Sequence, residues 1–256
     1  MLTSVRSLLA ATILAGCAFA ATPALADDAA PADPTPEFTV TGNVALVTDY
    51  RFRGVSQSAG DPAIQGGLTL NHKSGLYVGA WSSSINFANV GADATFGNQE
   101  LDLFGGWTGS LTNNLTLDAG LLYYAYPGGH VGKAEFFEPY ASLSTTVGPA
   151  KLKVGANYAW SQDAIYNDDN LYLYTNVDIG IPNTPVTVSG HLGYQDGPLA
   201  ADFWSSPDET TWDWSIGASA TVLGHLSLGV AYVGNGSPAI DGLTDDAVVG
   251  TLSASF

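Results

Sequence analysis

The chain has 256 residues, of which 46% are hydrophobic, and its 24 Asp and Glu outnumber its 7 Lys and Arg, which gives a net charge of −17. This acidity excludes nucleic acid as a partner, because phosphates require a basic surface. Beyond the N-terminus no run of about eighteen apolar residues occurs, which excludes a helical membrane span. The length that follows the N-terminal apolar stretch, about 230 residues, fits one domain.

Residues 1–26 have the pattern of a secretory signal peptide. Arg6 precedes an apolar stretch, and Ala24-Leu25-Ala26 forms a small-x-small cleavage site before Asp27. A second interpretation is open, because Leu14-Ala15-Gly16-Cys17 resembles a lipoprotein lipobox, in which Cys17 would be acylated. We favour a mature N-terminus at Asp27, since a closed barrel satisfies its own backbone in the membrane and needs no lipid anchor.

Residues 27–37 are rich in Ala, Pro and Asp and are expected to form a disordered periplasmic leader. From residue 38 onward, segments of about ten residues with apolar side chains at every second position alternate with turns, which is typical of a transmembrane β-barrel. The predicted strands cover residues 38–53, 63–71, 76–86, 98–109, 115–126, 136–147, 151–161, 170–181, 186–195, 211–222, 225–234 and 247–256.

The connections between these strands are alternately short and long. This alternation is expected when short periplasmic turns face longer extracellular loops. We therefore predict an all-β fold in which residues 38–256 form a single antiparallel barrel of about twelve strands, with both termini periplasmic. The last strand ends in Phe256 and is expected to close the barrel against the strand that contains Val44. An aromatic C-terminus also predicts recognition of Phe256 by the barrel-assembly machinery and integration into the outer membrane.

Aromatic residues on the apolar face gather near the strand ends. The predicted extracellular girdle contains Tyr50, Phe52, Tyr123, Phe137, Tyr158, Trp160, Tyr194, Trp212, Trp214 and Tyr232, and the periplasmic girdle contains Phe38, Trp107 and Phe256. Two girdles are typical of a barrel in a bilayer. A soluble β-sandwich, the alternative fold, would bury its tryptophans mid-strand. The strand at 76–86 is ambiguous, because Tyr77 and Trp81 oppose Leu76 and Val78.

Charged residues fall on the opposite, lumen face, where they avoid the cost of about 2 to 4 kcal/mol for Arg or Lys at the bilayer midplane. The predicted pore-lining and constriction residues are Asp49, Arg51, Arg53, Glu100, Asp102, Asp118, Glu138, Tyr140, Tyr172, Tyr174, Asp178 and Asp213. One interpretation is a constriction in which Arg51 and Arg53 face the acidic pair Glu100 and Asp102, so that crossed charges select solutes. The other is a salt-bridged ladder that fills and stiffens the interior.

Tyrosines form the next candidate cluster. By strand parity, Tyr124, Tyr126, Tyr140, Tyr172 and Tyr174 point into the lumen. They form either a track for sugars and aromatic solutes or, as we favour, a hydrogen-bonded filling of the interior. The acidic loops contain no Asp-x-Asp-x-Asp-Gly calcium pattern, so we expect solvated charge, no metal site and no cofactor.

The opening of the predicted barrel resembles the TorF family of putative porins. The likeness is carried by residues 42–57 (GNVALVTDYRFRGVSQ), 61–67 (DPAIQGG) and 74–81 (SGLYVGAW), and continues more loosely through Glu138-Pro139-Tyr140 and Trp212-Asp213-Trp214. The resemblance implies an outer-membrane barrel that acts as a channel. It implies no substrate and no catalytic residues.

Catalysis would require a nucleophile, a base and an orienting group held together. The chain has no Gly-x-Ser-x-Gly elbow and no metal spacing of Cys or His, and His191 is expected to be a hydrogen-bonding filler of the lumen. We therefore predict no enzyme. The predicted function is a passive channel for small hydrophilic solutes, narrow and cation-preferring, with outer-membrane lipid and lipopolysaccharide as its surroundings. Alternatives are a closed structural or adhesive barrel and, less favoured, a lipid-modifying enzyme.

Overall fold

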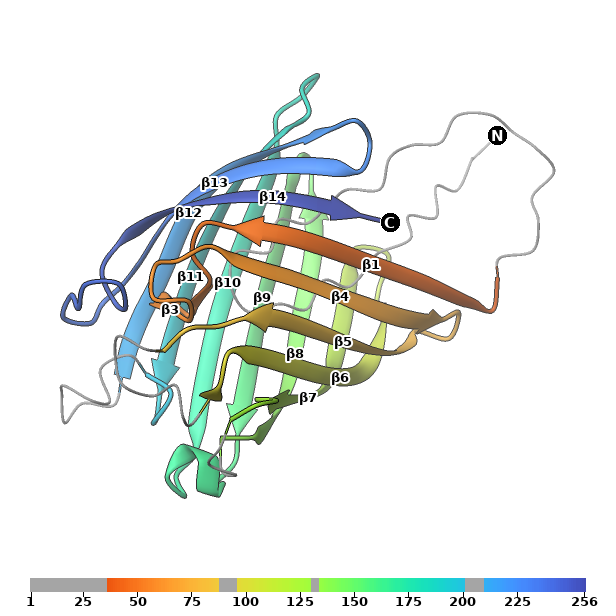
Figure 1. The fold of residues 1–256 in the computed structure, drawn as a ribbon. Coiled ribbons are helices and arrows are strands. Elements are labelled where there is room, and N and C mark those ends of the chain that lie inside the picture. The colour runs from red at the N-terminus through yellow and green to blue at the C-terminus, as the bar shows by residue number, and fades with distance from the viewer. Residues whose placement is uncertain (1–35, 88–95, 130–133, 201–209) are drawn as a thin grey trace, which may run out of the picture.

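The computed structural model describes residues 36–87, 96–129, 134–200 and 210–256, so the predicted signal peptide and almost all of the leader lie outside the described residues. Twelve antiparallel strands form a closed barrel in the order β1-β14-β13-β12-β11-β10-β9-β8-β7-β6-β5-β4, and β4 pairs back to β1 (Figure 1). The predicted fold class is confirmed.

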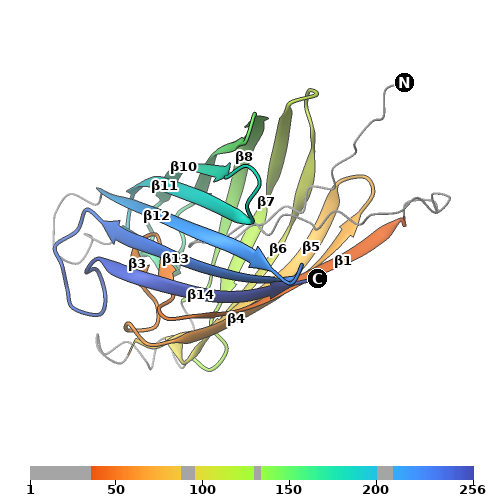
Figure 2. The same ribbon diagram turned by 90° about the horizontal axis from the view of Figure 1, so that it is seen from above.

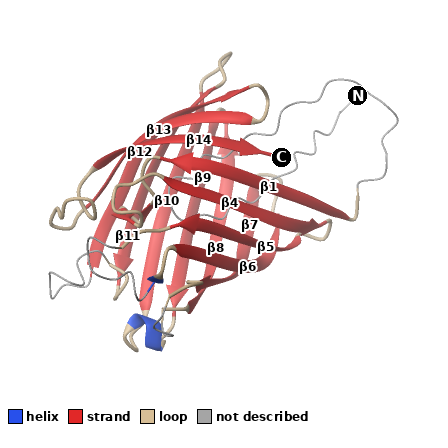
Figure 3. Ribbon diagram, in the orientation of Figure 1, coloured by secondary structure: helices blue, strands red, loops and turns tan. Residues whose placement is uncertain are grey.

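The barrel strands are β1 (Phe38–Val47), β4 (Ala63–His72), β5 (Leu76–Ser84), β6 (Gln99–Ser110), β7 (Leu115–Ala125), β8 (Phe136–Val147), β9 (Ala150–Ala159), β10 (Asn170–Gly180), β11 (Val186–Asp196), β12 (Thr210–Val222), β13 (Leu226–Asn235) and β14 (Ala247–Ser255). Turns of two to five residues alternate with connections of ten to fifteen residues, as predicted. A short 3-10 helix, η2 (Asp163–Ile165), lies in the connection between β9 and β10 (Figure 3).

The barrel closes between its first and last strands. In this pairing Val44 lies opposite Ala254, and Gly42 and Phe256 exchange two backbone hydrogen bonds of 2.9 and 3.0 Å. Figure 2 shows β14 beside β1 from a second direction. The predicted closure of the C-terminal strand on the first strand is confirmed.

Side chains alternate between an exposed outer face and a covered inner face along each strand. On β1, Val40 and Leu46 are 60% and 52% exposed, whereas Ala45 is buried. On β5, Tyr77 and Trp81 are buried and Leu76 is exposed, which resolves the strand whose orientation the sequence left ambiguous. An apolar wall of this kind matches a lipid environment. Within the described ranges, no helix is both long and apolar enough to cross a membrane.

Strand β1 ends at Val47, six residues before the predicted boundary. Residues 48–62, which we call the inner segment, turn into the barrel and form a small separate hairpin of β2 (Arg51–Phe52) and β3 (Val55–Ser56). Tyr50 is buried, and Phe52 packs against buried aromatic clusters, so assigning these two residues to the extracellular girdle was wrong. In the sequence the apolar alternation continues through the inner segment. Its apolar side chains, however, pack inside the barrel, whereas those at alternate positions of β1 face outward.

Most of the remaining aromatic residues of the predicted extracellular girdle form ring contacts along the outer wall. Tyr123 and Phe137 lie 4.5 Å apart between ring centroids, Tyr194 and Trp212 lie 4.9 Å apart, and Trp214 contacts Tyr232 at 5.2 Å. These contacts join neighbouring strands at the end of the barrel that carries the long connections.

Candidate functional site

The inner segment is a compact, strained loop. Arg53 and Ala59 have φ angles of 49° and 57°, and Gly54 and Gly60 have φ angles of 81° and 77°. Left-handed backbone is unfavourable for residues that carry a Cβ, and it persists only where surrounding contacts fix it. The segment therefore depends on its contacts with the barrel. It also carries three of the predicted site residues, Asp49, Arg51 and Arg53, which lie after β1 and not on it.

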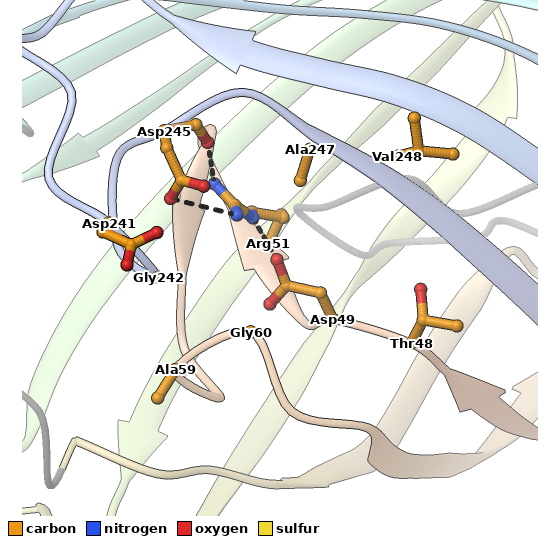
Figure 4. A pocket seen from close by; sticks show the side chains of 10 residues that line it. All are labelled: Thr48, Asp49, Arg51, Ala59, Gly60, Asp241, Gly242, Asp245, Ala247 and Val248. Carbon is orange, nitrogen blue, oxygen red and sulfur yellow. Dashed lines mark hydrogen bonds and ion pairs between the residues drawn. The ribbon is translucent and has the colours of Figure 1, made fainter.

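Arg51 joins the inner segment to the connection before β14. Its Nε donates to Asp49, and its Nη1 donates to the carbonyls of Gly54 at 3.2 Å, Leu243 at 3.4 Å and Asp245 at 2.6 Å. The Asp245 carboxylate lies 3.7 Å from Nη2. These bonds hold the guanidinium, whose side chain is only 3% exposed, between two loops (Figure 4).

Asp49 is fixed from the other side. Ser56 Oγ and Ser58 Oγ donate to its Oδ1 at 2.6 and 3.1 Å. A cavity of about 560 Å³ lies beside this network, between the inner segment and the connection 236–246 (Figure 4). Its lining consists of Thr48, Asp49, Arg51, Ala59, Gly60, Asp241, Gly242, Asp245, Ala247 and Val248.

Arg53 reaches the opposite wall. Its Nη2 donates to Glu138 Oε1 and Oε2 at 2.7 and 2.8 Å, and both side chains are at most 2% exposed. Tyr124 and Asn157 also donate to Glu138, and the guanidinium lies 4.2 Å from the centroid of the Tyr172 ring. Burial lowers the pKa of Arg53, but the charge and hydrogen bonds of Glu138 together with Tyr124 and Tyr172 outweigh it, so the pKa lies above its ordinary value.

Glu100 and Asp102 are buried on the inner face of β6, but they are not the partners of the arginines. Glu100 accepts a long hydrogen bond of 3.4 Å from Tyr50 Oη, and neither acid forms an ion pair with a Lys or Arg of the described residues. Burial raises the pKa of Tyr50, and these two carboxyl groups raise it further. The expected crossing of Arg51 and Arg53 with Glu100 and Asp102 is therefore replaced by pairs with Asp49, Asp245 and Glu138.

Aromatic packing fills the interior around the inner segment. One buried cluster contains Tyr50, Trp81, Ile85, Phe87 and Val233, and a second contains Leu122, Tyr124, Phe136, Tyr140 and Ile165. Phe52 packs against both clusters. The inner segment therefore links two sides of the wall at the end of the barrel that carries the long connections.

Polar side chains pair along the wall in the rest of the lumen. Tyr77 Oη donates to Asp118 at 2.6 Å and lies 2.5 Å from Tyr140 Oη. His191 lies within 2.9 Å of Tyr172 Oη, Asp213 and Asn176, and keeps a quarter of its side chain exposed. These contacts place the predicted Asp118, Tyr140, Tyr172 and Asp213 on the inner face.

The other two predicted site residues also lie on the inner face. Asp178 accepts a hydrogen bond of 2.7 Å from Ser189, and Tyr174 lies near Lys153, whose Nζ is 6.0 Å from the ring centroid. Several tyrosine rings lie across glycines of neighbouring strands, such as Tyr140 across Gly120 and Tyr174 across Gly155. The sequence indicates part of this pattern, because each of these glycines occupies an inward-facing position of its strand. Which tyrosine lies across it depends on the register between the strands.

A closed antiparallel barrel with an apolar outer wall, aromatic residues at the strand ends and a polar interior has the architecture of an outer-membrane β-barrel. A family described as "Bacterial protein of unknown function (Gcw_chp)" matches residues 31–256, and the chain belongs to this family. The description does not carry the TorF name, so that resemblance stays a prediction. No curated protein matches the sequence.

Solved structures of similar fold are porins and channels. A structure described as KdgM porin matches with a TM-score of 0.55 and 6% identity, over 84% of this chain and 98% of that chain. NanC porin matches with a TM-score of 0.55 and 11% identity, over 85% and 99%. An outer-membrane channel from Pseudomonas putida F1 matches with a TM-score of 0.52 and 13% identity, over 90% and 99%. At these identities the likeness concerns the fold.

Proposed function

We propose that the protein is an integral outer-membrane channel for the passive diffusion of small hydrophilic solutes, narrow and selective for cations. The observation that carries this proposal is a closed barrel whose inner wall is charged and into which the inner segment carries two arginines. An inward-folded charged segment reduces the cross-section and brings a passing solute close to fixed charges.

The strand number supports a narrow passage. About eight strands leave an interior that side chains fill, whereas the 16 to 18 strands of wide porins leave an aqueous channel. Twelve strands lie between these limits, and the inner segment takes up part of the space. We infer a small conductance.

Cation preference follows from the lumen charges that lie outside the two arginine pairs. The charges cancel within each of two ion pairs, Asp49–Arg51 and Glu138–Arg53. The remaining acids on the inner face, five in number, outnumber the two remaining lysines. The acids are Glu100, Asp102, Asp118, Asp178 and Asp213, and the lysines are Lys151 and Lys153. A lumen with this excess of negative charge attracts cations and repels anions.

Purified protein in planar bilayers under a KCl gradient tests the proposal. We expect a reversal potential of the cation-selective sign, reduced by Glu100→Gln plus Asp102→Asn. The matched control is Gln99→Ala, which removes a neutral side chain from the outer face of the same strand and should leave selectivity unchanged. Anion selectivity of the native protein would contradict the charge argument.

A closed structural barrel is the second candidate, and the packing of Phe52 between two aromatic clusters favours it. Such a barrel would insert into bilayers and conduct no ions, although its heat-modifiable mobility in SDS would show that it is correctly folded. Lipid hydrolysis by the same sample would instead favour the enzymatic alternative.

Export and insertion are part of the proposal. We infer cleavage before Asp27, and an intact mass that includes a diacylglyceryl group on Cys17 would contradict it. Phe256 is 71% exposed and closes the ladder against Gly42, a position that suits recognition by the barrel-assembly machinery before insertion. Lipid and lipopolysaccharide would then surround the apolar wall.

A further inference from the structure

The barrel wall does not need the inner segment for closure. The ladder closes through the pairs of β1 with β14 and with β4, while β2 and β3 form a separate two-stranded sheet. Withdrawal of this hairpin from the lumen would break no hydrogen bond of the twelve-stranded ladder. The same wall is therefore compatible with the segment inside or outside the lumen.

Two contacts of different kinds hold the segment inside. At the outer contact, Arg51 binds the carbonyls of Leu243 and Asp245, and Ser56 N donates to Leu243 O at 2.8 Å. At the inner contact, Arg53 pairs with Glu138. Asn235 Nδ2 reinforces the attachment through a bond of 3.1 Å to Gly54 O. The segment is thus fastened at its charged residues to two parts of the barrel that are distant in sequence.

These contacts favour two discrete positions over a continuous range. A buried guanidinium that loses its carboxylate leaves two uncompensated charges away from water, which is strongly unfavourable. The left-handed conformations of Arg53 and Ala59 likewise lose the contacts that sustain them when the segment shifts. Fully inserted, both arginines are paired; fully withdrawn, both are solvated. Partial insertion satisfies neither condition.

We propose that residues 49–61 are a gate, closed when Arg51 and Arg53 hold Phe52 between the two aromatic clusters and open when the segment withdraws toward the extracellular side. The inference rests on the proposed channel function and adds its regulation. In the closed position Phe52 and the Arg53–Glu138 pair occupy the lumen. In the open position they leave it, and the wall stays intact.

A reversible crosslink tests the gate. A Cβ at Gly60 would lie 4.0 Å from Gly242 Cα, so cysteines at these two positions are close enough for a disulfide, which spans Cα atoms about 4.4 to 6.8 Å apart. We expect the oxidised G60C/G242C protein to open at least tenfold less often in planar bilayers than the same molecules after reduction. The single variants G60C and G242C are the matched controls and should not respond to reductant.

Substitution of the arginines gives an independent test that does not need the crosslink. Arg51→Ala plus Arg53→Ala should raise the open fraction severalfold. Arg51→Lys plus Arg53→Lys keeps the charges but cannot reproduce the contacts of one guanidinium with three carbonyls and a carboxylate. The gate therefore requires the lysine variant to resemble the alanine variant in open fraction, whereas a purely electrostatic role would leave it like the native protein.

The outcomes separate the gate from the channel. Equal opening of the oxidised and reduced crosslink variant, or a lysine variant that behaves like the native protein, overturns the gate while the channel stands. No conductance from the native, reduced and double-alanine proteins, each shown to be folded by heat-modifiable mobility, overturns the channel itself.

Discussion

The two halves of the lumen pair their polar groups in different ways. In the half toward the long connections, which we propose to be extracellular, charges are deeply buried and their partners come from the inner segment, as in the pair of Arg53 with Glu138, at most 2% exposed. In the half toward the short turns, polar groups bond along the wall, as Asp178 does with Ser189, and this contact is only partly buried. The difference teaches that the inner segment and the aromatic side chains of the wall together fill the half toward the long connections.

The comparison depends on which end is extracellular, and a thiol-labelling scan gives an all-or-none answer. A cysteine at Asp168, in the exposed connection after β9, should react with a membrane-impermeant reagent on whole cells. A cysteine at Asn183, in the short turn after β10, should react only after the outer membrane is permeabilised. The reverse pattern would place the packed half at the periplasm.

Loss of the inner ion pair should expose the inner segment strongly. Ser56 is 1% exposed, so a cysteine there should be nearly unreactive in an otherwise native background. Adding Glu138→Ala leaves Arg53 buried without its counter-charge, at a cost of about 3 to 5 kcal/mol. We expect at least tenfold faster labelling of the cysteine. Asp178→Asn, in the other half, is the control and should not change the rate; equal labelling in both backgrounds would remove the distinction between the halves.

Two glycine substitutions test whether tyrosine rings pack closely against glycines of the neighbouring strand. A Cβ at Gly155 would collide with the Tyr174 ring, whereas a Cβ at Gly190 meets no atom within 4 Å. Gly155→Ala should therefore lower the free energy of unfolding by about 1 to 3 kcal/mol, as overpacking does. The measurement is the temperature of the SDS mobility shift, with Gly190→Ala as the matched control. Equal shifts would indicate that the ring does not lie against the wall.

The smallest effect is expected from a single wall charge in the half toward the short turns. Asp118 is bonded by Tyr77 Oη, and Asp118→Asn removes one negative charge while it keeps an acceptor oxygen. The reversal potential under a KCl gradient should move modestly toward zero, and labelling of a cysteine at Ser56 should stay unchanged. The shift should diminish in 1 M salt, where the Debye length falls to about 3 Å. A change in labelling would show that the two halves are coupled.

The sequence by itself determined the barrel and its two faces. The period of two in apolar residues specifies strands with one apolar side, and each side-chain orientation follows from the pleat. Strand limits agree closely with the structure for eleven strands because turns rich in Gly, Pro and Asn interrupt the pattern. The inward orientation of Glu138, Asp178 and Asp213 follows from the same local rule.

Only the tertiary structure decided where the first strand leaves the wall and what its charges contact. Apolar alternation does not distinguish a side chain that faces lipid from one that enters a core, so Tyr50 and Phe52 carried the same signal as Val40 and Val44. The partner of Arg53 lies 85 residues away, and that of Arg51 in the last connection lies more than 190 residues away. Local periodicity is set by neighbouring residues, whereas these pairings arise from barrel closure, which brings distant strands around one lumen.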